Sequence, residues 1–241
     1  TMIEIIDTSK SYEKGKKAVD RLNLKIGNSM IFGFLGPNGA GKTTTIKMIT
    51  GIISADEGDI IVDGYSIKKE PLNAKMNFGY VPDNSDIVWR LKGLEYLNFI
   101  ADIYRVSKEK RKERIEKYSE LFDLKDNLNQ YITTYSRGMK QKLMLIASLL
   151  NDPKNWILDE PIVGLDPIIA HALKTEMQQR AKDGGCVFFS THILEIAEQL
   201  CDKIAIINKG CLLFEGTIEE VKEAKNQENS LEQLFLELVD G

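Results

Sequence analysis

The chain has 241 residues, of which 43% are hydrophobic and 28% are charged, a composition that fits one folded domain or one domain with an inserted subdomain. The net charge of −4 at pH 7 excludes the global basic field that nucleic-acid-binding proteins use, so we expect no nucleic-acid partner. The longest apolar run, residues 143–150, is far shorter than the roughly 20 residues that a membrane span needs. Because no signal-peptide pattern is visible either, we expect a cytoplasmic protein that relies on another chain for any work across a membrane.

Two strands are predicted at the start of the chain, at residues 2–12 and 22–26, because apolar residues alternate in both segments. A charged turn at residues 13–17 separates them. Tyr12 lies just before this turn. One interpretation of Tyr12 is an ordinary aromatic residue at the end of a strand. The alternative is that its ring stacks on an adenine, because stacking requires little more than a flat π-face.

A glycine-rich segment follows, between an apolar strand at residues 30–35 and a helix-like segment at 44–49. It matches the P-loop pattern G-x-x-x-x-G-K-T, whose glycines let successive N–H groups point at phosphate oxygens beside a helix N-terminus. Lys42 would place its charge on the β- and γ-phosphates, and the Thr43 hydroxyl would ligate Mg²⁺. The residues expected around the phosphates are Gly36, Pro37, Asn38, Gly39, Ala40, Gly41, Lys42, Thr43 and Thr44.

The middle of the chain changes to helical character. A strand at 59–62 and a strand at 78–81, ending in a Pro82-Asp83 turn, precede predicted helices at 91–104 and 108–124. The second helix has an apolar stripe, and its charged remainder is interpreted as a solvated surface rather than a binding patch. We interpret residues 84–150 as a helical subdomain inserted into an α/β core.

An apolar strand at residues 155–158 then ends in two carboxylates, Asp159 and Glu160. Ligands of open α/β sheets bind at the carboxyl ends of strands, so we expect this pair to face the P-loop. Asp159 would hold Mg²⁺ directly or through water, and Glu160 would orient the attacking water. The alternative is an acidic turn after a buried strand.

The last third continues the α/β pattern, with a helix at about 168–182 and a buried strand at 186–190 that ends at His192. A lone histidine is usually structural, and the alternative here is a hydrogen bond to the γ-phosphate. A hairpin at 203–214 and helices at 217–225 and 231–239, with Ser230 as N-cap, are predicted to close the chain. The three cysteines share no metal-ligand spacing and are interpreted as reduced core thiols.

Taken in order, six segments resemble the motifs of the ATP-binding subunit of ABC transporters. They are Gly36–Thr43, the loop after Tyr80-Val81-Pro82, the signature Tyr135-Ser136-Arg137-Gly138-Met139, Asp159-Glu160, Leu165-Asp166 and Ser190-Thr191-His192. The resemblance implies one ABC-type ATP-binding domain over residues 1–241, of the α/β class. Its P-loop NTPase core would have a mixed sheet flanked by helices and an antiparallel β portion. The inserted helical subdomain, 84–150, would carry the signature, and residues 217–241 would form a helical extension.

The resemblance also implies a function: two such domains pair head to tail around two ATP molecules and power a separate membrane permease from the inner face of the membrane. The second domain would be a copy of this chain or a different subunit, and the permease would dock between the helical insert, around residues 84–96, and the core. Each ATP would lie on one P-loop and be capped by Ser136 and Gly138 of the partner, with Asp166 at the seam. The remaining roles implied are adenine stacking by Tyr12 with Val19, catalysis by Lys42, Glu160 and His192, and Mg²⁺ binding by Thr43, Asp159 and Asp83.

Three features set this chain apart within the resemblance. Arg137 stands where the family usually has Gly, and it would reach a phosphate or a partner carboxylate. Asp83 stands where the family usually has Gln, which keeps an oxygen ligand but adds a charge and shortens the reach. The tail, residues 230–238, and the signature resemble ATPases of drug and antibiotic exporters. Two other functions are alternatives: a soluble ABC ATPase acting on ribosomes, DNA or a cofactor-assembly complex, and a non-hydrolysing nucleotide sensor, which Asp83 and Arg137 suggest.

Overall fold

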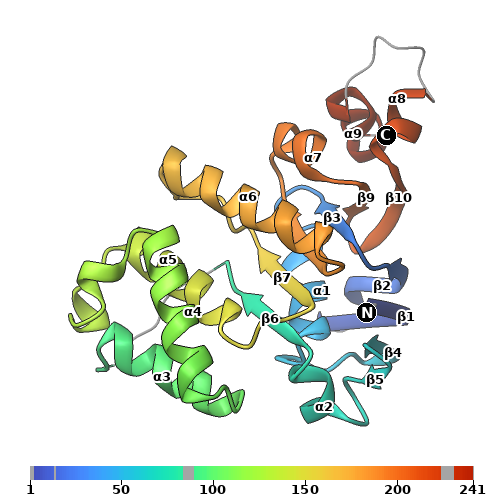
Figure 1. Ribbon diagram of the computed structural model, residues 1–241. Helices are drawn as coiled ribbons and strands as arrows, with labels where there is room; N and C mark the ends of the chain where they lie inside the picture. The colour runs from blue at the N-terminus through green and yellow to red at the C-terminus, as the bar shows by residue number, and fades with distance from the viewer. Residues whose placement is uncertain (1–2, 14, 84–89, 224–230, 241) are drawn as a thin grey trace.

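Two β-sheets form the centre of the molecule in the computed structural model, which describes residues 3–13, 15–83, 90–223 and 231–240. The smaller sheet is antiparallel with the strand order β2-β1-β4-β5, and the larger is mixed with the order β10-β9-β3-β8-β7-β6 (Figure 1). The smaller sheet contains β1 (Ile3–Glu13), β2 (Lys16–Ile26), β4 (Glu57–Val62) and β5 (Tyr65–Ser66). The larger contains β3 (Met30–Leu35), β6 (Phe78–Val81), β7 (Asn155–Asp159), β8 (Cys186–Thr191), β9 (Lys203–Asn208) and β10 (Cys211–Thr217).

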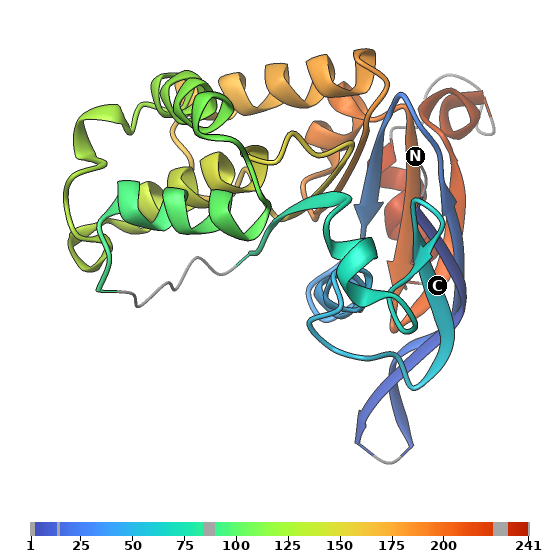
Figure 2. The same cartoon turned by 60° about the horizontal axis from the view of Figure 1, so that its bottom comes forward.

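Helices flank these sheets, and one group of them stands to the side of the molecule. The helices of the core and the C-terminal part are α1 (Lys42–Ile49), α2 (Pro71–Lys75), α6 (Pro167–Lys182), α7 (Leu194–Leu200), α8 (Ile218–Glu223) and α9 (Leu231–Asp240). The group at the side consists of α3 (Gly93–Ile103), α4 (Lys108–Leu121) and α5 (Arg137–Leu149) (Figures 1 and 2). This architecture confirms the predicted fold class, a P-loop α/β core with an antiparallel portion and a helical part.

Most elements fall where periodicity predicts them. The hairpin of β9 and β10 is antiparallel, with Cys211 opposite Asn208. The segments that periodicity missed are short: α2, α7 and the two-residue β5. Residues 84–89, where the predicted helical subdomain begins, and the predicted N-cap Ser230 lie outside the described residues.

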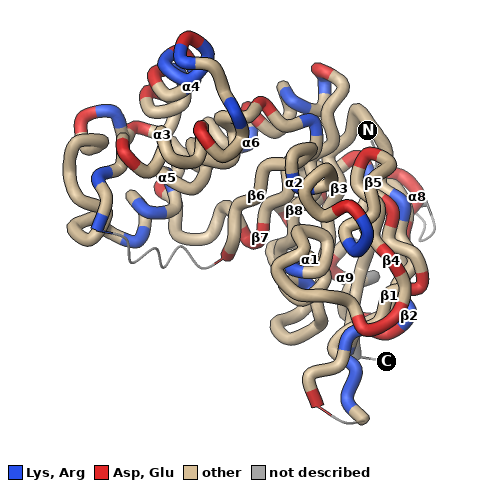
Figure 3. The backbone as a smooth tube through the Cα atoms, turned by 90° about the horizontal axis from the view of Figure 1, so that it is seen from below, with Lys and Arg blue, Asp and Glu red and all other residues tan. Residues whose placement is uncertain are grey.

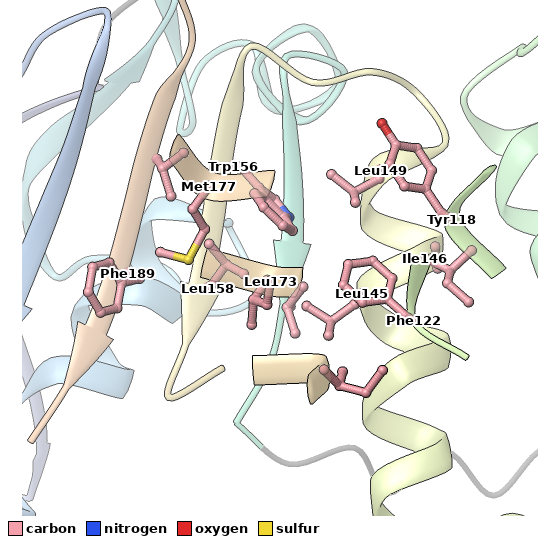
Figure 4. Packing of buried hydrophobic residues seen from close by; sticks show 14 of the residues in the cluster. Tyr118, Phe122, Leu145, Ile146, Leu149, Trp156, Leu158, Leu173, Met177 and Phe189 are labelled. Atoms are coloured by element: carbon pink, nitrogen blue, oxygen red, sulfur yellow. The ribbon is translucent and has the colours of Figure 1, made fainter. Parts of the chain in front are cut away.

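The helices at the side share one hydrophobic core with the larger sheet. Figure 4 shows Trp156 of β7 among side chains of α6, and the cluster continues to Phe122, beyond the end of α4, and to α5. The indole nitrogen of Trp156 donates a hydrogen bond to Ser148 Oγ at 2.9 Å, and the Arg180 guanidinium lies 5.6 Å from its ring. Because a buried donor is costly when unpaired, this bond fixes α5 against the strand that ends in Asp159.

A second hydrophobic core surrounds α1 and joins the two sheets. Its aromatic centre is formed by Phe32 and Phe34 of β3 with Phe188 of β8. The ring centroid of Phe188 lies 5.9 Å from that of Phe32 and 5.5 Å from that of Phe34. Rings at this separation add to the stability that their burial supplies. The two strands that carry these rings, β3 and β8, lead directly to the P-loop and to His192.

The helix α4 carries charge along most of its length, as Figure 3 shows. Its predicted apolar stripe is present: Ile115 and Tyr118 are buried, and Phe122 follows the helix into the core. The hydroxyl of Ser107 accepts a hydrogen bond from the backbone N–H of Lys110, which caps the helix. The charged face therefore belongs to the outside of a helix that is held by its apolar stripe.

The interpretation of all three cysteines as core thiols is wrong at one position. Cys186 in β8 and Cys201 after α7 are buried, whereas Cys211 is exposed at the start of β10. Residue 211 begins a strand at the edge of the sheet, where alternate side chains face solvent. An apolar, strand-like run does not show which of its residues point outward, so the sequence could not separate Cys211 from the other two.

Candidate functional site

The P-loop connects β3 to α1 through a turn that requires glycine. Gly41 is the N-cap of α1 with φ +112°, and a Cβ there would lie 2.6 Å from the carbonyl oxygen of Ala18. Both facts exclude a larger residue. The Thr45 hydroxyl donates to Gly41 O at 2.9 Å, which tightens the first turn of the helix. The N-terminal N–H groups of α1 are thus directed toward the loop, as a phosphate site needs.

Lys42 is almost fully buried and lies inside the loop. Its ammonium group donates to the carbonyl oxygens of Gly36 at 2.7 Å and Pro37 at 3.2 Å. It also lies 3.4 Å from a carboxylate oxygen of Glu160. A phosphate oxygen is a stronger acceptor than a neutral carbonyl, so the lysine is held where a bound triphosphate would redirect it.

The two predicted carboxylates lie next to this lysine because β7 neighbours β8, and β8 neighbours β3. Asp159 is fully buried and accepts a hydrogen bond of 2.6 Å from Ser190 Oγ, while its Oδ2 has no hydrogen-bond partner among the described residues. Burial raises the pKa of Asp159 above its ordinary value, and the hydroxyls of Ser190 and Thr43 oppose that shift. An unpartnered buried oxygen of a carboxylate beside a hydroxyl fits a divalent cation.

Asp83 follows β6, the strand beside β7, and its side chain is exposed. Its negative charge contributes to the raised pKa of Asp159 and, after burial and Asp159 itself, to the raised pKa of the Tyr80 phenol. Asp83 therefore lies near Asp159, at the same end of the sheet. Within the described ranges, no three His, Cys, Asp or Glu side chains are grouped to hold a metal, so a cation here would depend on phosphate or water oxygens for its remaining ligands.

Glu160 has an unusual backbone conformation, with φ +48°. A positive φ costs free energy in a residue other than glycine and is concentrated at functional sites. Its N–H donates to Ser190 Oγ at 3.1 Å, and its carboxylate oxygens each lie 3.1 Å from Nδ1 of His192. When Nδ1 carries the proton and donates a hydrogen bond to this carboxylate, Nε2 of the imidazole remains free to face a ligand.

Ser190 belongs to the sixth segment of the resemblance, but sequence reasoning gave it no role. It is buried, and its hydroxyl connects the side chain of Asp159 to the backbone of Glu160. The parallel register pairs Asp159 with Ser190. The signal in the sequence was a serine near the end of one apolar strand, since the neighbouring strand ends in an aspartate.

The signature lies at the start of α5, apart from this cluster. Ser136 is the N-cap of α5, and its hydroxyl accepts from the N–H of Met139 at 3.2 Å. A Cβ on Gly138 would meet no atom closer than 3.8 Å, and Arg137 is exposed. Among the described residues no hydrogen bond joins Ser136 or Gly138 to the P-loop, and no P-loop atom lies within 4 Å of a Cβ built on Gly138. The single chain therefore does not bring the two motifs into contact.

Asp166 is the N-cap of α6, where its carboxylate accepts from the N–H of Ile169 at 3.0 Å. That backbone hydrogen bond is the main cause of its lowered pKa, and the Lys142 ammonium, 3.7 Å away, contributes. Asp166 thus stabilises α6 and approaches α5 in the single chain, and a carboxylate at a helix N-terminus is favourably placed.

Tyr12 and Val19, expected to hold adenine together, lie in different environments. Tyr12 is 62% exposed and lines an open pocket of about 630 Å³ that also touches Gly39 of the P-loop. Val19 is fully buried among the residues of the second hydrophobic core. In this structure Val19 supports the P-loop from within and its side chain is not available to a ligand, which corrects the expectation.

Comparisons with known proteins agree with this geometry. The family model described as ABC transporter matches residues 19–163. The chain is 38% identical over 230 residues to the uncharacterized ABC transporter ATP-binding protein YhcH of Bacillus subtilis, covering 95% of this chain and 73% of that protein. It is 37% identical over 219 residues to the linearmycin resistance ATP-binding protein LnrL of the same organism, covering 90% and 69%.

The similar solved structures are also ATP-binding proteins of ABC transporters. A structure described as the ATP-binding subunit of an ABC transporter has a TM-score of 0.93 and 31% identity, and the match covers 99% of both chains. A dimeric structure of a bacterial ABC transporter cassette has a TM-score of 0.81 at 22% identity, covering 89% of this chain and 98% of that one, which shows a shared fold. No helix within the described ranges is both long and apolar enough to cross a membrane. The family match spans more than half of the chain, and the chain belongs to the ABC transporter family as one of its ATP-binding subunits.

Proposed function

We propose that this ATP-binding subunit hydrolyses ATP with Lys42, Glu160 and His192 as its catalytic residues. The observation that carries the proposal is the continuous line from Lys42 Nζ to the Glu160 carboxylate at 3.4 Å and from there to His192 Nδ1 at 3.1 Å. These groups follow three neighbouring strands, β3, β7 and β8. Ligands of α/β sheets bind at this edge.

The three side chains have separate roles in phosphoryl transfer to water. Lys42 leaves the carbonyls of Gly36 and Pro37 and stabilises charge on the β- and γ-phosphates. Glu160 accepts a proton from the attacking water or orients it, and its carboxylate is placed for this by His192 and by the bond from its N–H to Ser190. The free Nε2 of His192 contacts the γ-phosphate.

Residues 36–44 hold the triphosphate, and Tyr12 stacks on the adenine at the edge of its pocket. The residues that would hold Mg²⁺ are Thr43, Asp159 and, directly or through water, Asp83. When bound, the ion would neutralise phosphate charge. The unpartnered Oδ2 of Asp159 supports this placement.

A second copy of the chain completes each site. Ser136 and Gly138 lie at the N-terminus of α5, whose N–H groups favour an anion, yet the single chain keeps them apart from its own P-loop. A molecule that carries both halves of a site suits a two-fold, head-to-tail pairing, in which each P-loop meets the partner's signature. Asp166, at the start of α6, would lie at the seam. In this arrangement residues 1–241 act as one ATP-binding domain, with 84–150 as the part that presents the signature.

A separate membrane permease is the partner whose transport this subunit powers by ATP hydrolysis. A cavity of about 190 Å³ lies between β6, α3 and α5, with an aromatic lining that includes Phe78, Tyr80, Tyr96 and Tyr104. Such a cavity has room for one apolar side chain, which a short helix of the permease would insert. The relative LnrL is a linearmycin resistance ATP-binding protein, which favours export of a drug-like compound by a permease that holds this subunit at the inner face of the membrane.

Phosphate release from ATP and Mg²⁺ tests the catalytic assignment. We expect steady release by the wild-type chain and a loss of roughly 100-fold or more in Glu160→Gln, because a positioned general base typically contributes that much. Glu198→Gln is the matched control, since Glu198 lies on α7 and accepts from the N–H of Leu231 at 2.9 Å. Absence of hydrolysis in the wild-type chain would favour the nucleotide-sensor alternative, and unchanged hydrolysis in Glu160→Gln would refute the role of that residue.

A further inference from the structure

The turn between β9 and β10, formed by Lys209 and Gly210, is bonded directly to the P-loop. The N–H of Gly210 donates to the carbonyl of Ala40 at 2.8 Å, and the carbonyl of Gly210 accepts from the N–H of Asp20 at 2.9 Å. A Cβ on Gly210 would lie 2.8 Å from the carbonyl oxygen of Ala18. The turn therefore holds the loop and β2 together and cannot move independently of either.

The side chain of Lys209 reaches the nucleotide side of this junction. It is exposed and lines the same pocket of about 630 Å³ as Tyr12 and Gly39. In the part of the chain that the structure describes, no ion pair involves Lys209. Lys209 has φ +48° and Gly210 φ +81°, a turn in which Asn or Gly is the favoured first residue, so turn geometry does not account for a lysine here.

The other charged groups of the pocket leave it cationic. Lys16 and Lys17 come from the start of β2, and Glu13 from the end of β1. Lys17 is engaged by Asp20, with their charged atoms 2.6 Å apart. The hairpin of β1 and β2 projects from the molecule (Figure 2), so Lys16 and Glu13 stand at its far end, whereas Lys209 is anchored beside the P-loop.

We propose that Lys209 is a nucleotide-binding residue whose ammonium group contacts the α- and β-phosphates of ATP. The proposal rests on the proposed function, because it takes the Tyr12 pocket as the adenosine side of the ATP site. A ligand that lies between Tyr12 and Gly39 passes Lys209, and its anionic phosphates provide the partner that this cation lacks. Since the γ-phosphate lies further along, near Glu160 and His192, Lys209 sets affinity for ADP and ATP alike and does not act in the chemical step.

The test is equilibrium binding of ADP, measured by calorimetry with wild-type chain and Lys209→Met. We expect the Kd for ADP to rise roughly three- to fivefold at low salt, as for an exposed charge pair, with the difference shrinking as salt is added. The KM for ATP should rise by the same factor while kcat is unchanged. Lys182→Met, an exposed lysine at the end of α6, is the control, and Lys209→Arg should retain most of the affinity.

Three results would overturn the proposal: Lys209→Met binds ADP as tightly as Lys182→Met, Lys209→Arg loses as much affinity as Lys209→Met, or kcat falls while the Kd for ADP stays constant. The second and third would indicate a structural role of the turn instead of a charge contact. Failure of the proposed function gives a different pattern. A wild-type chain that binds ADP but releases no phosphate from ATP would contradict catalysis and leave the ADP comparison fully informative.

Discussion

At the scale of single residues, the site is organised by one hydroxyl between two carboxylates. Ser190 Oγ donates to Asp159 and accepts from the N–H of Glu160, so it holds both the buried carboxylate and the strained backbone of the next residue. The side chain of Asp159 has no other hydrogen bond from β8 among the described residues. Burial raises the pKa of Asp159, so each hydrogen bond donated to this carboxylate helps to keep it ionised.

Ser190→Ala should damage hydrolysis more than a buried serine elsewhere would. Loss of the hydroxyl leaves a buried carboxylate oxygen without its donor, which costs about 1–3 kcal/mol of stability, and the shifted Glu160 should lower kcat on the order of tenfold. Ser119→Ala is the control, because Ser119 is also buried but donates to Glu116 O within α4. Phosphate release and thermal unfolding measure the two effects. Equal kcat in both variants would contradict the positioning role.

The thiols provide a second test at this scale. Burial raises the pKa of Cys186 to about 12 and raises the pKa of Cys201 as well, so neither forms the thiolate that alkylating reagents attack. Cys211 is exposed. Iodoacetamide at pH 8 should therefore modify one position in the native chain and all three in denaturant, as located by peptide mass spectrometry. Rapid native modification of Cys186 would show that β8 opens.

Site residues were predictable from sequence where chemistry and spacing are local. The P-loop, Asp159 and Glu160 form contiguous motifs beside strong apolar strands, and the structure places them at one edge of the sheet. Val19 and Cys211 were misjudged because alternation identifies a strand but not which face meets the core. The role of Ser190 was not predicted because it depends on the register of two strands that are distant in sequence.

At the scale of elements, the start of α5 is built for a group that the single chain does not provide. A Cβ on Gly138 would meet nothing nearer than 3.8 Å, whereas one on Gly93, at the start of α3, would lie 2.3 Å from the hydroxyl oxygen of Tyr135. Internal packing therefore requires Gly93 to be small and does not require it of Gly138. The free space above Gly138 suits the close approach of a phosphate.

Gly138→Ala and Gly93→Ala should consequently have opposite effects. Gly138→Ala should leave unfolding unchanged or raise stability by roughly 0.5 kcal/mol, because alanine is the better helix former, yet it should impair hydrolysis by crowding the ATP. Gly93→Ala should lower the Tm through the clash with Tyr135. Calorimetric unfolding together with phosphate release separates the two. A destabilised Gly138→Ala chain would show that this glycine serves the helix itself.

Elements were predictable in proportion to their length and amphipathicity. The apolar stripe of α4 and the strands of the larger sheet gave clear periods, so the sequence placed them within a few residues. The helices α2 and α7 span five and seven residues, too few turns for a period to be recognised.

At the scale of the whole molecule, one hydrophobic core joins the helices α3, α4 and α5 to the larger sheet. Phe122 is fully buried in this cluster together with Trp156 and Phe189. The side group of helices in Figure 1 is therefore coupled to β7, which ends in Asp159, and to β8, which leads to His192. Movement of the signature relative to the P-loop has to work against this shared packing.

Phe122→Ala should destabilise both parts together, by about 3–5 kcal/mol, because it leaves a cavity at the centre of the cluster. Urea unfolding followed by circular dichroism and by tryptophan fluorescence should give one coincident transition at a lower midpoint. Phe99→Ala, which alters a side chain that is 44% exposed, should change the midpoint little. Separate transitions, with the helical signal lost first, would contradict a shared core.

Sharing of each ATP site between two copies of the chain is tested most directly by mixing two inactive variants. Lys42→Ala removes the charge from the P-loop, and Gly138→Asp places a carboxylate where the partner's phosphate would bind. Neither variant alone should hydrolyse ATP. In a mixture, the mixed dimer combines an intact P-loop from one copy with an intact signature from the other, so phosphate release should return in part. A mixture as inactive as its components, or full activity of Gly138→Asp alone, would contradict a site shared between two copies.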